Sequence, residues 1–291
     1  MRPGSTDVFP HRPSSRTARQ PARMGAALVA ALVVLTGLAA CTSAPRQQQA
    51  QMQQPDKEGV PTPPNPDSGK RAAIRLQLAG AYFTEGRLDP ALQEVNQALA
   101  LDPDLAGAHA LLALVLDAKG DVPGADAAFR RAIQLDPRDG ATLHNYGWMQ
   151  CRRERYDEAA RLLDQALAAP GYRGTAQTLL VKGVCEARAG KFDQAEQTLL
   201  RAYERDAGNP VTAVNLADVL YRRGEFERAR FYVRRVNQSA ELSNAESLWL
   251  AMRIERKLGN QQGVRDLGSQ LLSRYPRSSE ALAYEAGRYQ P

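Results

Sequence analysis

The sequence predicts an all-α protein built from six consecutive helix–turn–helix units, and three observations lead to this prediction. From Arg71 onward, the pattern of small and large residues repeats every 34 to 36 positions. A glycine recurs at the same place in five of the six units, as is typical of a helix C-terminus. Only 6% of the residues are aromatic, which argues against an all-β sandwich and against a platform for stacking nucleic-acid bases.

Residues 1–40 have the layout of a signal peptide. Arginines occur up to Arg23, and the following run to Ala40 has no charged residue. The 17 uncharged residues are few for a membrane span, which needs about 20. If translation started at Met24 instead of Met1, the arginines would be lost.

The end of this segment reads Leu-Ala-Ala-Cys, and it resembles the lipobox of bacterial lipoproteins. The resemblance implies that the chain is cut before Cys41 and that palmitate or another acyl chain is attached to its sulfur and to the new amino terminus. Several acyl chains give stable anchoring, whereas one chain alone is marginal. The alternative is an ordinary signal peptide with a cysteine nearby by chance.

Residues 41–70 are predicted to be a disordered tether. Between Thr42 and Lys70 there are six glutamines and six prolines, with hardly any large apolar residue to bury. A flexible chain of about 30 residues has a root-mean-square reach on the order of 30 Å. The tether would keep the folded part close to the membrane.

Residues 71–291 hold the repeats. The predicted units are 72–105, 106–139, 140–175, 176–209, 210–244 and 245–278, followed by a capping helix within 279–291. They begin near Ala72, Ala106, Gly140, Ala176, Pro210 and Ala245. Small residues at positions 8, 20 and 27 of a unit, with Leu at 7 and Pro at 32, resemble the tetratricopeptide repeat. The small residues allow the two helices of a hairpin to approach closely.

The turn inside each unit has its own signals. Glycine ends the first helix in every unit except the third, which has Glu154 there. Three residues later, Asp89, Asp157, Asp193 or Glu227 begins the second helix in four units. We expect these acids to cap free amides and to meet the positive end of the helix dipole.

A search for catalytic or metal-binding motifs gives mostly negative results. No HExxH, GxSxG, CxxC, GxGxxG or P-loop spacing occurs. Without the first forty residues the chain has 33 basic and 31 acidic residues, so no global basic field would attract nucleic acid. We therefore expect no enzyme, no cofactor, no metal and no small-molecule substrate. His109 occupies a packing position.

A stack of such repeats offers a concave groove lined by the first helix of each unit. In the first two units, the groove positions hold Leu76, Phe83, Ala110 and Leu114. The third unit places His144, Trp148 and Arg152 there. Further arginines and aromatic residues follow in the later units: Arg188, Tyr221, Arg222, Trp249, Arg253 and Arg256. A partner-binding groove is one interpretation. Packing between neighbouring units and simple solvation of the arginines are the alternatives.

Two cysteines remain in the repeats. Cys151 and Cys185 fall on the first helices of adjacent units, which are neighbours in a stack. In an exported protein, oxidising conditions favour a disulfide where the geometry allows one. Two buried thiols that act as small apolar groups are the alternative.

Several segments resemble a narrower family. They are HNYGWMQC at 144–151, APGYRG at 169–174, GVC at 183–185 and SLWLAMRIERKLG at 247–259. Together with the lipobox and tether, they are similar to the PilF/PilW type IV pilus biogenesis lipoproteins. The resemblance implies a pilotin on the periplasmic face of the outer membrane that promotes localisation and assembly of the pilus secretin. Thr42 after Cys41 fits outer-membrane sorting. The alternative function is another periplasmic repeat scaffold, which would recruit envelope hydrolases or assembly factors.

Overall fold

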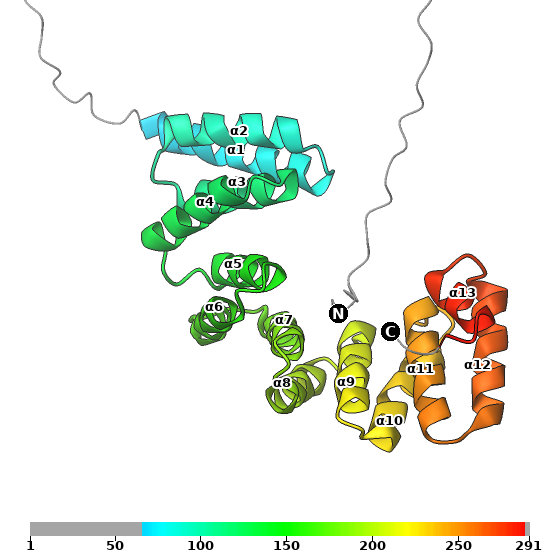
Figure 1. Cartoon of the computed structure of the whole chain (residues 1–291). Helices are drawn as coiled ribbons and strands as arrows, with labels where there is room; N and C mark the ends of the chain where they lie inside the picture. Colours follow the sequence, from blue (N-terminus) through cyan, green and yellow to red (C-terminus); the bar gives the residue numbers. More distant parts are fainter. Residues whose placement is uncertain (1–65, 289–291) are drawn as a thin grey trace, which may run out of the picture. The chain divides into compact units, whose positions relative to one another are not determined.

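The computed structural model describes residues 66–288, all of which belong to one compact unit of the chain. The predicted signal peptide, Cys41 and residues 42–65 of the predicted tether lie outside the described residues. The described part is entirely helical, with no strand, and this confirms the predicted all-α class (Figure 1). Its thirteen helices are α1 (Pro66–Thr84), α2 (Leu88–Leu101), α3 (Ala106–Lys119), α4 (Val122–Leu135), α5 (Gly140–Arg152), α6 (Tyr156–Ala168), α7 (Thr175–Arg188), α8 (Phe192–Arg205), α9 (Pro210–Arg222), α10 (Phe226–Asn237), α11 (Ala245–Lys257), α12 (Gln261–Arg274) and α13 (Ser279–Glu285).

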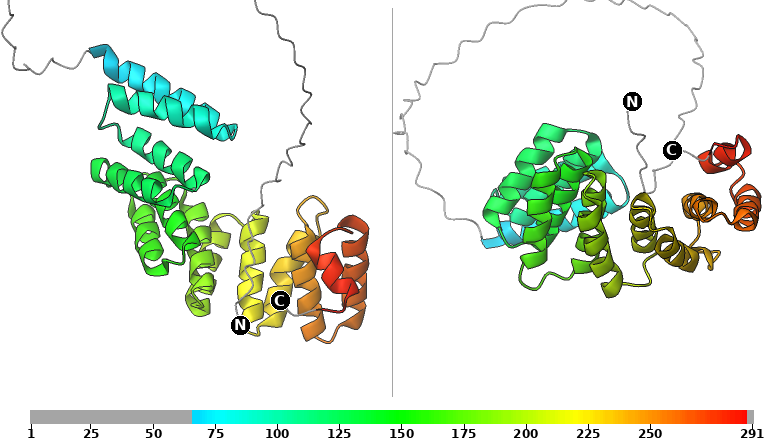
Figure 2. Two further views of the ribbon diagram at one scale, coloured as in Figure 1. Left: turned by 45° about the horizontal axis from the view of Figure 1, so that its top comes forward. Right: turned by 60° about the horizontal axis from the view of Figure 1, so that its bottom comes forward.

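The helices form hairpins that follow one another in chain order (Figures 1 and 2). Within each hairpin the odd-numbered helix packs on the even-numbered helix after it, and each even-numbered helix packs on the first helix of the next hairpin. Successive odd-numbered helices also contact one another, whereas the described even-numbered helices do not. The first helices of the units therefore line one continuous side of the stack.

The helix starts agree closely with the predicted units. Helices α3, α5, α9 and α11 begin at the predicted residue, and α7 begins one residue earlier. Helix α1 differs, because it begins at Pro66 and so includes residues 66–70, which the sequence analysis assigned to the tether. Proline at the first position and Asp67 in the first turn both favour a helix start there. Helix α13 lies within the predicted cap.

The small residues predicted at positions 8, 20 and 27 lie inside the hairpins. In the first unit these are Ala79, Ala91 and Ala98, and none of them is exposed to solvent. In the fourth unit position 8 is Gly183, where an added Cβ would lie 2.6 Å from Leu199 Cγ. Such contacts leave no room for a side chain, so the two helices can approach closely only with small residues.

The sixth unit solves the same packing problem in another way. Met252 and Val264 are large where small residues are usual, and both are buried. The space appears instead at Gly268, where an added Cβ would lie 2.2 Å from the Tyr284 ring of α13. The capping helix thus inserts an aromatic side chain into the position that glycine leaves open.

The turn inside each unit has a left-handed residue after the first helix. This residue is Gly86, Gly120, Gly190, Gly224 or Gly259 in five units, with φ between 73° and 84°. In the third unit Glu154 takes the same conformation with φ 60°, and no other non-glycine residue of the described chain has positive φ. The predicted glycine positions are therefore confirmed.

The expected capping by acids at the second helices is wrong. Asp89, Asp157 and Asp193 are the second residues of α2, α6 and α8, and none of these helices has a side-chain cap. Their carboxylates instead meet cations of the following unit: Lys119 for Asp89, Lys191 for Asp157 at 3.1 Å and Arg223 for Asp193 at 3.1 Å. A carboxylate that is already inside the helix can turn toward the neighbouring unit, which offers a full charge.

Candidate functional site

The groove residues of the first two units are half-buried. Leu76 packs on the core beside Ala79, Val95, Ala98 and Ala108, and an added Cβ on Gly107 would lie 3.3 Å from it. Phe83 and Ala110 are also half-buried, and Leu114 packs on the core that the second and third hairpins share. Part of each side chain therefore stabilises the stack, and only the remainder is available to a partner.

Trp148 of α5 is the centre of a cluster of aromatic and basic groups. The guanidinium carbon of Arg152 lies 5.9 Å from its ring centroid, and that of Arg188 from α7 lies 5.3 Å from it. Trp148 also packs on the hydrophobic core on both sides of the α5–α7 junction. A cation over an indole face is attracted to the ring, so the two arginines help to fix the Trp148 ring between α5 and α7.

A second pair of the same kind lies further along the stack. Arg253 of α11 places its guanidinium carbon 4.6 Å from the Tyr221 ring centroid on α9. Its Nε is buried without a hydrogen-bond partner. Arg222 pairs with Asp218 at 2.6 Å and lies 5.9 Å from the Phe192 ring. Arg222 and Arg253 therefore contact side chains of their own or a neighbouring helix and are not simply solvated.

Arg152 is also tied to the preceding unit. Its guanidinium forms an ion pair with Asp117 of α3, and Arg153 binds the same carboxylate at 2.9 Å. Asp117 is mostly buried, with 13% of its side chain exposed. A partly buried carboxylate with two arginines links the second and third units across the groove side.

His144 belongs to a hydrogen-bonded group at the next junction. Its Nδ1 lies 2.8 Å from Thr178 Oγ1, which lies 2.8 Å from Tyr172 Oη. Burial lowers the pKa of the His144 imidazole, so the neutral ring is favoured. Tyr172 comes from the irregular APGYRG segment, and its ring fills the space next to Gly140 and Gly174. His144 thus holds this irregular junction together.

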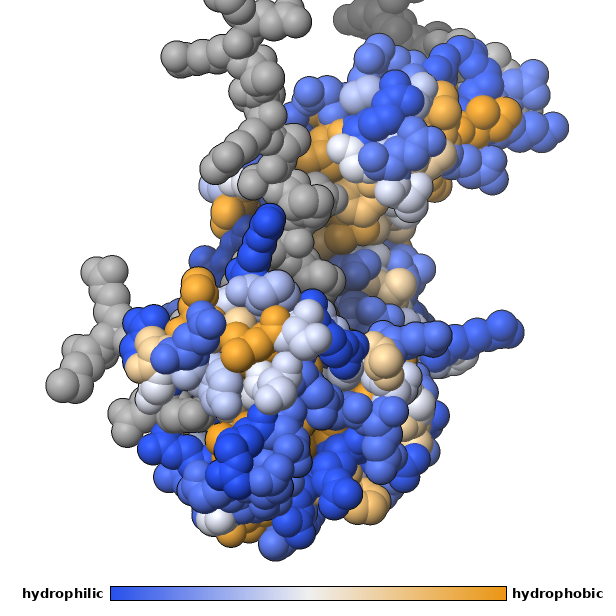
Figure 3. Space-filling view, turned by 90° about the vertical axis from the view of Figure 1, so that its right-hand side faces the viewer, coloured by the Kyte–Doolittle hydropathy of each residue, from blue (hydrophilic) through white to orange (hydrophobic). Residues whose placement is uncertain are grey.

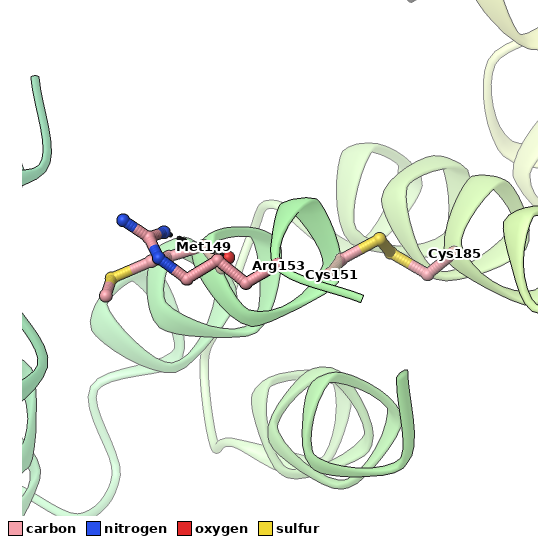
Figure 4. The surroundings of a disulfide bond; sticks show 4 residues. All are labelled: Met149, Cys151, Arg153 and Cys185. Carbon is pink, nitrogen blue, oxygen red and sulfur yellow. Dashed lines mark hydrogen bonds between the residues drawn. A yellow bond between two sulfur atoms is a disulfide. The ribbon is translucent and has the colours of Figure 1, made fainter. Parts of the chain in front are cut away.

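Cys151 and Cys185 are joined by a disulfide that connects α5 to α7 (Figure 4). Their Cα atoms are 5.7 Å apart, and both residues are buried. Arg153 donates a hydrogen bond to the Met149 carbonyl at 3.2 Å. The disulfide spans the junction beside the APGYRG segment, where the repeat is longer by two residues.

The last units place three carboxylates near one another on the groove side. Glu246 is the second residue of α11, Asp218 lies on α9 and Glu280 on α13. Burial first, and then repulsion from Glu280 and Asp218, together raise the pKa of Glu246 to about 7. This carboxyl group is therefore protonated in part near neutral pH.

Over residues 66–288, no group of three or more His, Cys, Asp and Glu residues could hold a metal ion. None of the helices in the same range is long and apolar enough to cross a membrane. On the face shown in Figure 3, hydrophobic residues form small patches among hydrophilic ones.

One exposed surface was not predicted from the sequence. Ile74 and Leu78 lie on the side of α1 away from its neighbours, with 63% and 37% of their surfaces exposed. The sequence does contain a signal for this exposed surface. Position 3 of a unit is isoleucine only in the first unit, and smaller residues occupy it elsewhere: Ala108, Thr142, Thr178, Thr212 and Ser247.

Comparison with known protein families agrees with the repeat pattern. Two tetratricopeptide-repeat models match the chain, one at residues 76–140 and 151–210 and the other at 186–248. The chain is also 29% identical over 231 residues to the type IV pilus assembly protein PilF of Pseudomonas aeruginosa. That similarity covers 79% of this chain and 90% of PilF.

Two solved structures resemble the chain over nearly their whole length. PilW, described as a widely conserved type IV pilus biogenesis factor, has a TM-score of 0.69 and 29% identity, and covers 74% of this chain and 98% of its own. The P. aeruginosa PilF structure has a TM-score of 0.68 and 28% identity, and covers 76% and 99%. The YrrB structure, at 17% identity and a TM-score of 0.54, shares the fold.

Proposed function

Because this chain belongs to the tetratricopeptide-repeat proteins of type IV pilus biogenesis and is homologous to PilF and PilW, we propose that it is an outer-membrane pilotin. In this role it is a non-enzymatic lipoprotein, anchored through Cys41 on the periplasmic face, that promotes localisation and assembly of the pilus secretin. The observation that carries the proposal is the similarity to PilF and PilW through the whole repeat region, at 98–99% of the two solved chains.

The groove is the surface that we assign to the partner. Leu76, Phe83 and Leu114 are large apolar side chains of which part remains accessible on the side of the odd-numbered helices. A partner segment that covers them would bury apolar surface, while polar groups such as Arg152 set its register. Trp148 and His144 are already engaged with their own neighbours, so they shape the groove more than they bind.

The groove is tested by substitution in cells that assemble the secretin. We expect Phe83→Ala and Leu76→Glu to weaken secretin multimers greatly, because loss of a central anchor costs about 2 kcal/mol, roughly thirtyfold in affinity. The matched control is Arg253→Ala with Arg256→Ala at the far end of the stack, which should do less. Normal multimers with a stably folded Leu76→Glu, Phe83→Ala protein would exclude this surface.

Because Leu76 also packs on the core, the melting temperature of each variant must accompany the assembly measurement. Phe83→Ala is the more informative of the two, since Phe83 is outside the described core clusters. A lower melting temperature with reduced assembly would indicate packing and not binding.

The anchor is tested separately. Mass spectrometry of the membrane-extracted protein should find an acylated Cys41 as its first residue, and Cys41→Ser should release the protein from the outer membrane. An unmodified N-terminus, or a Cys41→Ser protein that still sediments with that membrane, would contradict the anchor. If the secretin assembles normally without this protein while other envelope proteins are mislocalised, the scaffold alternative replaces the pilotin.

A further inference from the structure

The two ends of the repeat stack differ. At the C-terminal end α13 packs on α11 and α12, with Ala281 fully buried and Tyr284 placed against Gly268. Among the described residues, no helix covers the other side of α1 at the N-terminal end. The difference is visible at equivalent positions of the six units.

Position 10 of a unit is buried wherever a preceding unit exists. The residues at this position are Val115, Met149, Cys185, Val219 and Ile254. Position 3 is likewise buried in all five later units. In the first unit these positions hold Ile74 and Ala81, and both are exposed. The second helix of the preceding unit covers this surface at every internal junction, so α1 presents an unoccupied helix-packing surface.

Four exposed residues of α1 and Glu85 directly after it form one stripe, which we call the end stripe: Arg71, Ile74, Leu78, Ala81 and Glu85. Their spacing of three and four residues is the a/d spacing with which two helices pack along a seam. Two apolar residues and an alanine occupy its centre. A basic residue stands at one end and an acidic residue at the other.

We propose that the end stripe is the contact between two copies of this chain, which pair antiparallel through α1 about a two-fold axis near Leu78. In this arrangement Leu78 contacts Leu78 of the second copy. Ile74 lies beside Ala81 of the second copy. Arg71 of each copy lies near Glu85 of the other, so the charges are self-complementary, as a two-fold interface requires.

Within one copy, only a weak interaction competes with the proposed Arg71–Glu85 contact between copies. Glu85 lies 3.4 Å from Arg87, and more than half of each side chain is exposed, so this ion pair is weak and easily exchanged. In the sequence between Thr42 and Asn65, the only large apolar residues are Met52 and Val60. Anchoring of both copies in one membrane would raise their effective concentration, but the contact itself does not depend on the anchor.

The test uses the full-length protein extracted from membranes. Sedimentation equilibrium in density-matched detergent should give a dimer for the parent chain. Leu78→Glu should raise the dimer dissociation constant at least about tenfold. The matched control is Phe231→Glu, which changes a side chain of α10 with 57% exposure and should leave the dimer unchanged.

Charge reversal tests the register directly. Arg71→Glu alone and Glu85→Arg alone should each weaken the dimer by about threefold, and the double variant should restore it. Leu78→Cys should form a covalent dimer in intact envelopes, whereas Phe231→Cys should not. The parent chain, which has its own cysteines, shows how much covalent dimer forms without an introduced cysteine.

Three results would overturn the proposal. They are a monomer at micromolar concentration, a double charge variant that is no better than the single ones, or a Leu78→Cys adduct with a different protein or with lipid only. Measurement of secretin multimers in the Leu78→Glu strain keeps this inference separate from the proposed function: a lost dimer with normal secretin leaves the pilotin role intact.

Discussion

Cys151 of the third unit and Cys185 of the fourth are joined across the α5–α7 junction, with their Cα atoms 5.7 Å apart. They are separated by 34 positions in the sequence, so the bond closes a loop of one repeat. The disulfide lies beside the irregular APGYRG segment, which contains Tyr172. A covalent link there restrains two units whose spacing departs from the rest of the stack.

The first prediction is that the stability of the protein depends on this disulfide. Denatured, non-reduced protein should offer neither Cys151 nor Cys185 to an alkylating reagent, and both should react after reduction. In the chain-entropy account, a loop of about 35 residues stabilises the fold by roughly 3 to 4 kcal/mol. The Cys151→Ala, Cys185→Ala protein should therefore unfold at a lower denaturant concentration, and two reactive thiols in the non-reduced chain would contradict the pairing.

The second prediction concerns glycines inside helices. Gly183→Ala places a Cβ 2.6 Å from Leu199 Cγ and 3.3 Å from the Leu199 backbone nitrogen, and the backbone cannot move away easily. We expect a loss of about 1 to 3 kcal/mol in the free energy of unfolding. Gly80→Ala is the matched control, since its Cβ would meet nothing within 4 Å. In that helix it should stabilise by about 0.5 to 1 kcal/mol. If both substitutions changed the free energy of unfolding equally, the close approach of the two helices at Gly183 would not be the cause of the destabilisation.

The third prediction is that Glu154→Gly stabilises the protein. Glu154 holds φ at 60°, a conformation that costs a non-glycine residue roughly 1 to 2 kcal/mol. Part of this gain is lost because glycine gives the unfolded chain more freedom, so we expect a net gain of about 0.5 to 1 kcal/mol in chemical denaturation. Gly190→Glu, at the equivalent turn of the fourth unit with φ 76°, should have the opposite effect. If Gly190→Glu left the free energy of unfolding unchanged, backbone strain at this turn position would be excluded as the cause.

The sequence predicts those features that depend on a single residue and its repeat position. Glycine at the end of a first helix and alanine at a close helix contact each have one physical cause, and the structure has them where the pattern places them. The features that depend on the neighbouring unit were harder to predict. Asp89 and Asp193 were expected to cap their own helices, but Lys119 and Arg223 of the next unit offer them a full charge.

The candidate site shows the same limit. The pattern assigned Leu76 to a groove position, but it could not say how much of this side chain is used for packing on its own core. Nor could it show that Arg152 is held by Asp117 from the preceding unit. Both depend on side-chain contacts between units, which sequence position alone does not determine.

The last prediction follows from Glu246, whose pKa is raised to about 7 by burial and by Glu280 and Asp218. The folded protein binds this proton more tightly than the unfolded chain does, since the ordinary pKa is 4.5. The stability that the protonated carboxyl contributes is therefore complete below about pH 4.5 and is lost as the pH rises through about 7. Above pH 7 the ionised carboxylate destabilises the α9–α11–α13 end, by about 1 to 2 kcal/mol after allowance for partial solvent screening.

Glu246→Gln keeps the shape of the side chain and removes the titration. Its melting temperature should exceed that of the parent at pH 8 and match it at pH 5, so the difference between the two proteins should change with pH and not stay constant. Glu241→Gln is the matched control for the substitution itself, because Glu241 is exposed in the loop before α11. If the Glu246→Gln protein is shifted equally at both pH values, the carboxyl is ionised throughout this range and its burial does not govern the stability of this end of the stack.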